Sequence, residues 1–124
     1  MATTNSNSNE LIDHILANSL FTPRQIAIIS KRRHGRGKVE NISSGAYYRQ
    51  VRQCRQKIIA VLYSAILLQS TGILQSDALL TLSRLADQLG VIFNSQDSDI
   101  YSGRQKLNDV MSVMDELIKR MSKL

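Results

Sequence analysis

The sequence predicts an all-α protein of about five helices, and three observations support this. Hydrophobic residues make up 43% of the 124 residues and aromatic residues only 5%, with no tryptophan and a single proline. Apolar residues recur at helical spacing in several long segments. No segment shows the alternation of β-branched and aromatic residues, bounded by turn residues, that is typical of a strand. The length is that of one compact domain with a modest core.

The chain begins with a polar stretch, followed by a first amphipathic segment. We expect residues 1–7 to form a short disordered lead. They carry neither the positive charge nor the apolar run of a signal peptide. A first helix is predicted from about Ser8 to Leu20. Its apolar face is formed by Leu11, Ile12, Ile15 and Leu16.

The start of the second helix is the sharpest local signal in the chain. In "FTPRQI", Thr22 is the predicted N-cap, Pro23 occupies the first helical position, and Gln25 completes a capping box. Ile26 and Ile29 supply the expected apolar side. Basic residues fill the last turn, where they suit the helix dipole, and the two glycines of "HGRGK" end the helix.

The third helix, capped by Ser43 or Ser44, has two halves of different character. The first half has an apolar face, formed by Tyr47, Val51, Cys54 and Ile58, and an opposite polar face, formed by Arg49, Arg52, Gln53 and Gln56. The second half, residues 58–68, is apolar nearly all round, but it is shorter than the about 20 residues that a membrane span needs. A helix covered on all sides, by the core or by a dimer partner, is therefore predicted there.

The rest of the chain predicts a helical hairpin. A fourth helix, capped by Ser76 or Asp77, covers "SDALLTLSRLADQLGVIF", with Gly90 and "NSQDSD" marking its end, and a fifth runs from Ser98 or Ile100 to the C-terminus. The apolar stripe of the fifth helix suits packing against another helix and consists of Leu107, Met111, Met114, Ile118 and Met121. Residues 58–124 are therefore predicted to form an apolar helical core. Segments 58–70 and 100–124 are the candidate interface of a homodimer.

The positive charge of the chain is concentrated in one block, residues 21–57. This block holds ten basic residues and one acidic residue, a net charge of +9. Residues 1–20 contribute −2 and residues 58–124 contribute −1, which together give the net charge of +6. Such local asymmetry indicates a polyanionic partner more firmly than a high isoelectric point does.

Two groups of side chains in this block are candidates for nucleic-acid contact. Basic residues neutralise phosphates without reading sequence, and the phosphate candidates are Arg32, Arg33, His34, Arg36, Lys38 and Arg55. Arginine and glutamine pair with guanine and adenine edges in the major groove, and the base-reading candidates are Ser44, Tyr48, Arg49, Arg52 and Gln53. The alternatives are a solvated basic loop and an ordinary exposed helix face, since arginine and glutamine are good helix formers.

The segment "FTPRQIAIISKRRHG" resembles the opening of the LuxR-type and sigma-region-4-type DNA-binding domains. Thr22 and Gly35 keep the thirteen-residue spacing of those families, and "ISSGAYYRQVRQ" is similar to their recognition helix, with a shortened middle between the two. The start is also similar to that of small uncharacterised archaeal proteins with a Thr-Pro-Arg-Gln sequence. The resemblance implies a helix-turn-helix over residues 8–57 and a transcriptional regulator whose helix near Ser43 docks in the DNA major groove.

Catalysis, metals, cofactors and small-molecule substrates are not expected. The sole cysteine, Cys54, has no partner for a disulfide, which favours a cytoplasmic or nucleoid-associated protein. No histidine stands near Asp97 and Asp99, and no phosphate-cradling glycine motif occurs. Double-stranded DNA is thus the expected partner. Two alternatives stay open: a helical protein that docks its basic face on an acidic protein or an anionic membrane surface, and an RNA-binding protein.

Overall fold

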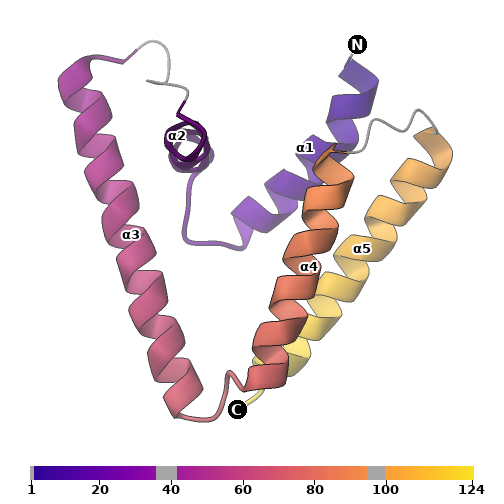
Figure 1. The fold of residues 1–124 in the computed structure, drawn as a ribbon. Helices are drawn as coiled ribbons and strands as arrows, with labels where there is room; N and C mark the ends of the chain where they lie inside the picture. The colour runs from indigo at the N-terminus through magenta and orange to yellow at the C-terminus, as the bar shows by residue number, and fades with distance from the viewer. Residues whose placement is uncertain (1, 36–41, 95–99) are drawn as a thin grey trace. The chain divides into compact units, whose positions relative to one another are not determined.

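The structure, a computed structural model, describes residues 2–35, 42–94 and 100–124. Over these ranges it contains helices and no strand, which confirms the all-α prediction. The helices are α1 (Ala2–Ala17), α2 (Pro23–Arg33), α3 (Ser44–Ser70), α4 (Ser76–Asn94) and α5 (Ile100–Met121) (Figure 1).

The chain divides into two compact units. Residues 16–66 form one, which we call the basic unit, and residues 1–15 together with 67–124 form the other, the three-helix unit. The division falls within α3, which continues across it as one helix. These bounds differ from the division between residues 57 and 58 that the composition suggested, and a single compact domain stays a prediction.

The core of the three-helix unit is built by the apolar faces of α1, α4 and α5. Its buried members are Leu11, Leu85, Leu107 and Met114, with Ile15, Leu89, Met111 and Leu117 packed against them. The ring Nε2 of His14 lies 2.8 Å from Oδ1 of Asp115 and joins α1 to α5. The predicted stripes therefore supply this core. One member of the predicted stripe of the fifth helix, Ile118, is nevertheless 45% exposed.

Both boundaries of α1 differ from the prediction, because the helix also ends at Ala17 rather than near Leu20. α1 begins at Ala2, so residues 2–7, expected as a disordered lead, are helical. Extending an existing helix is much easier than nucleating one, and these residues contain neither proline nor glycine. α4 includes Gly90 and ends at Asn94, where the predicted end signal "NSQDSD" begins. A glycine ends a helix when it adopts positive φ, which Gly35 and Gly72 do and Gly90 does not.

The core of the basic unit joins α2 to the first half of α3. Ile28 is fully buried, and Tyr47 and Cys54 are each 3% exposed. Around them pack the partly buried Ile29, Ile42 and Val51. Ile28, rather than the expected Ile26, therefore carries the apolar side of α2, since Ile26 is 36% exposed.

The N-terminal end of α3 forms as the sequence predicts. The hydroxyl of Ser43 accepts the N–H of Ala46 at 3.2 Å, which makes Ser43 the N-cap. At the other end Gly72 adopts φ 87°, and the carbonyl of Leu68 accepts the N–H of Leu74 at 3.0 Å. The second half of α3 was expected to be covered on all sides. Its large apolar side chains, among them Leu62, Tyr63 and Ile66, are exposed, and their cover by the core or by a dimer partner stays a prediction.

Candidate functional site

The N-terminus of α2 is fixed by the capping box that the sequence predicts. The hydroxyl of Thr22 accepts the backbone N–H of Gln25 at 3.2 Å, and Oε1 of Gln25 accepts the backbone N–H of Thr22 at 3.0 Å. Pro23 occupies the first position, where its missing N–H costs no hydrogen bond. α2 ends at Arg33, followed by the C-cap His34 and by Gly35, which adopts φ 67°. These local contacts fix the start and the end of the helix that carries Arg32 and Arg33.

A polar anchor connects this cap to α3. The ammonium of Lys57 donates to Oε1 of Gln25 at 2.9 Å and to the carbonyl of Leu20 at 2.6 Å, and it lies 5.9 Å from the ring centroid of Phe21. The Gln25 side chain is buried, with an exposed fraction of 7%. Lys57 is thus occupied by structural contacts and is withdrawn from the charge that an external partner meets. Nothing local in the sequence signals this role.

The thiol of Cys54 is a buried part of the same contact. It donates to the backbone carbonyl of Gln25 at 3.7 Å, the long distance of a weak sulfur hydrogen bond. Burial raises the pKa of the Cys54 thiol, and the Lys57 ammonium opposes this increase only in part. A thiol of this kind is protonated near neutral pH and unreactive, which agrees with the predicted role as a small buried hydrophobe.

The predicted base-reading residues lie on the exposed side of α3. Arg49, Arg52 and Gln53 are exposed and follow i, i+3, i+4 spacing, opposite the buried Tyr47 and Cys54. The exposure of these three side chains follows from the helical period, because one face of α3 packs in the core and the opposite face is left in solvent. This group is therefore brought together by α3 alone.

Two further candidates lie on an adjacent side of α3. Tyr48 is 60% exposed, and its ring meets that of Tyr47 edge to face, with centroids 5.4 Å apart and an interplanar angle of 74°. Arg55 is exposed about two turns further along. Ser44 is the first residue of α3 and is also exposed. The contact with buried Tyr47 limits the freedom of Tyr48, which reduces the entropy lost when its outer face binds a partner.

The phosphate candidates fall into two groups. Arg32 and Arg33 are exposed in the last turn of α2, and Arg36 and Lys38 lie outside the described residues. The His34 ring Nδ1 lies 2.8 Å from the carbonyl of Ser30. Because a carbonyl only accepts, Nδ1 carries the proton, and Nε2 can donate to a phosphate only when the imidazole is protonated. His34 is therefore a conditional phosphate contact.

The charge asymmetry of the sequence coincides with the division into units. Residues 16–66 contain all ten basic residues of the block and one acidic residue, whereas the three-helix unit carries a net −3. Among the described residues, the guanidinium groups of Arg49, Arg52 and Arg55 form no ion pair with a carboxylate. The arginine charge on α3 is thus exposed and not neutralised by its own unit.

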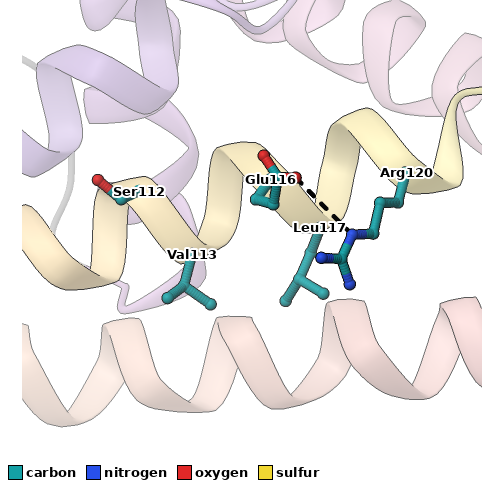
Figure 2. Close-up of a pocket in the computed structure, with 5 residues that line it drawn as sticks. All are labelled: Ser112, Val113, Glu116, Leu117 and Arg120. Carbon is teal, nitrogen blue, oxygen red and sulfur yellow. Dashed lines mark ion pairs between the residues drawn. The ribbon is translucent and has the colours of Figure 1, made fainter.

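A hollow on α5 is lined by Ser112, Val113, Glu116, Leu117 and Arg120 (Figure 2). Its charged members pair with each other, with Arg120 Nε lying 3.8 Å from Glu116 Oε1. Within the described ranges no three histidine, cysteine or acidic residues gather as a metal site would need. None of the helices that could be searched there is long and apolar enough to span a membrane.

No family model, curated protein or solved structure matches the chain. The helix-turn-helix resemblance therefore stays a prediction. The connection between α2 and α3 is longer than that of a helix-turn-helix. It has ten residues, 34–43, whereas the turn of a helix-turn-helix has three or four.

Proposed function

We propose that the basic unit binds double-stranded DNA and that the protein acts as a transcriptional regulator. The observation that carries the proposal is the exposed face of α3, where Arg49, Arg52 and Gln53 stand together inside a unit with a net charge of +9. Phosphates attract such a unit without regard to sequence. Arginine and glutamine on one helix face are the side chains that read guanine and adenine.

The proposal divides the work between two sets of residues. Arg32, Arg33, Arg36, Lys38 and Arg55 bind phosphates and orient the protein, and protonated His34 joins them. Arg49, Arg52 and Gln53 contact base edges, with Ser44 and Tyr48 at the border of this group. A helix in the major groove supplies only a few base contacts, so a group of this size is sufficient.

The salt dependence of DNA binding tests the electrostatic part. Five permanently charged contacts predict a slope of log affinity against log salt of about −4.5, or a loss of about 500-fold between 50 and 200 mM salt. Fluorescence anisotropy with a labelled random-sequence duplex measures this. Arg55→Ala should reduce the slope by about 0.9, whereas Arg84→Ala, an exposed α4 arginine in the other unit, should not change it. A duplex that does not bind at low salt would contradict the proposal.

A pair of variants tests the division of roles. Arg52→Ala should reduce discrimination between preferred and scrambled duplexes by about 1–3 kcal/mol, since it removes a base contact. Arg36→Ala should weaken binding to both duplexes by the same factor. The preferred duplex comes from selection on a random pool. Equal effects of both substitutions on both duplexes would refute the assignment of base reading to α3.

The other partners considered give different results in the same assay. A protein that docks on an acidic protein would bind duplex DNA weakly even at low salt. A membrane-surface protein would bind anionic vesicles more tightly than DNA. An RNA-binding protein would prefer a single-stranded or structured RNA to the duplex at equal length. Each of these outcomes would replace the DNA proposal.

A further inference from the structure

Tyr48 is an exposed aromatic residue beside the arginines of α3. It is the fifth residue of the helix and is 60% exposed. At 100° per residue, Tyr48 is rotated by about 40° from Arg52 and by about 20° from Arg55 around the helix axis. Both arginines are exposed as well. An aromatic ring therefore stands in the same line of side chains as two guanidinium groups.

The ring of Tyr48 is held by one contact and is otherwise largely exposed. It meets the ring of the buried Tyr47 edge to face, with centroids 5.4 Å apart. In the described part of the chain, no basic side chain lies over the Tyr48 ring, and the Tyr48 hydroxyl forms no hydrogen bond. The neighbouring arginines thus leave the apolar surface of this ring accessible to a partner.

The first turn of α3 leaves room beside this ring. Gly45 lies three residues before Tyr48, and a Cβ added at Gly45 would meet no described atom within 4 Å. Ser44, about one turn before Tyr48, is exposed and has a small side chain. No long side chain of the first turn of α3 therefore separates the Tyr48 ring from a partner that approaches this end of the helix.

The proposed docking of α3 limits which group of a base can cover the ring. Under that proposal Arg52 reaches a base edge in the major groove, and a tyrosine one turn earlier in the same line reaches nearly as far. The major-groove edges of guanine, adenine and cytosine present hydrogen-bond donors and acceptors, whereas thymine also presents its C5 methyl group. This methyl group is the apolar partner that a base edge offers to an exposed aromatic ring.

We propose that Tyr48 is a specificity-determining residue that packs its ring against the C5 methyl group of a thymine in the major groove. This inference rests on the proposed function and deepens it by naming one base of the target site. The hydroxyl of Tyr48 takes no part in the contact. Arg52 supplies the hydrogen bonds to a nearby guanine, so the two side chains read two bases from one line of α3.

The register of α3 limits the distance between these two bases. Tyr48 and Arg52 are four residues apart, which is about 6 Å along the helix at 1.5 Å per residue. Successive positions of a DNA strand are about 3.4 Å apart along the duplex. The thymine should therefore lie within about two base pairs of the guanine that Arg52 reads.

Selection from a pool of random-sequence duplexes tests this register. Sites selected by the wild-type protein should show a preferred thymine within about two base pairs of a preferred guanine. Arg52→Ala should lose the preference for the guanine, and Tyr48→Ala should lose the preference for the thymine. Selected sites without a preferred thymine in that interval would overturn the proposal.

Removing a single methyl group tests the contact itself. Deoxyuridine pairs with adenine as thymine does but lacks the C5 methyl group, so the selected duplex is compared with one that carries deoxyuridine at the preferred position. Wild-type protein should bind the thymine duplex about fourfold more tightly, the factor expected for burying one methyl group. Tyr48→Phe should keep this ratio because it keeps the ring, whereas Tyr48→Ala should reduce the ratio to about 1.

The matched control is Tyr63→Ala, which should keep the fourfold ratio. Tyr63 is a 69% exposed tyrosine of the same helix, fifteen residues beyond Tyr48. Equal wild-type affinity for the two duplexes would overturn the thymine contact and leave DNA binding intact. The contact is also refuted if the ratio persists in Tyr48→Ala, or if Tyr48→Phe abolishes it, which would assign the effect to the hydroxyl. A protein that binds neither duplex at low salt would overturn the proposed function and this inference together.

Discussion

The buried side chain of Gln25 gives a quantitative test of how α2 is held against α3. Its Oε1 accepts from the Thr22 N–H at 3.0 Å and from Lys57 Nζ at 2.9 Å. Gln25→Ala removes both bonds. The neutral bond is worth about 1 kcal/mol and the charge-assisted one about 1.5 kcal/mol, reduced because Lys57 is only half-buried. The expected loss of stability is therefore about 2.5 kcal/mol.

Urea unfolding followed by far-ultraviolet circular dichroism measures this loss. The matched control is Gln56→Ala on the exposed side of α3, which should change the free energy of unfolding by less than about 0.5 kcal/mol. Gln25→Glu keeps an acceptor for both donors and preserves the capping box, so it should retain most of the stability. If Gln25→Ala is no more destabilising than Gln56→Ala, the anchor does not hold the two helices together.

Three further predictions follow from the two cores and the thiol. Ile28→Ala should cost about 3 kcal/mol because the side chain is fully buried, whereas Ile26→Ala, 36% exposed, should cost less than about 1 kcal/mol in the same urea assay. Cys54 should react slowly with a maleimide at neutral pH and quickly in urea. Burial raises the pKa of the Cys54 thiol, so the folded state binds the thiol proton more tightly than the unfolded state does. The resulting stabilisation of the folded state is complete below the pKa of the unfolded thiol, and it is lost as the pH rises through the pKa of the folded thiol. Asp115→Ala should cost about 0.5–1 kcal/mol, since it removes the His14 contact at a partly exposed site, and a thermal melt with no shift would contradict this.

Local signals in the sequence predicted the helix boundaries that depend on neighbouring residues. The capping box at Thr22 and the cap at Ser43 each form within a few residues along the chain, and the structure contains both. The start of α1 was missed because it has no comparable cap. A local sequence pattern therefore predicts the end of a helix where a specific hydrogen bond between neighbouring residues fixes that end.

Contacts between distant residues could not be read in the same way. Lys57 was counted with the basic surface, yet its ammonium bonds to Gln25, 32 positions earlier in the chain. Ile28 was overlooked because Ile26, Ile28 and Ile29 are all apolar, and only the position of α3 selects which one is buried. The apolar second half of α3 indicated that a cover is needed, but composition does not say which surface supplies it.

The candidate DNA surface was predictable in its composition and in part of its geometry. Helical spacing placed Arg49, Arg52 and Gln53 on the face away from Tyr47, and the structure has them exposed there. Arg36 and Lys38 lie outside the described residues. DNA binding itself, and the roles given to these side chains, stay predictions that solution measurements decide.

Nuclear magnetic resonance titration of the full chain with a random-sequence duplex tests the DNA proposal most directly, because it identifies the contacted residues. The account predicts shift changes at Arg49, Arg52, Gln53 and Arg55 on α3, with the largest changes at low salt. The amides of α4 and α5 should remain unchanged. Changes confined to α4 and α5, or no changes at low salt, would contradict it.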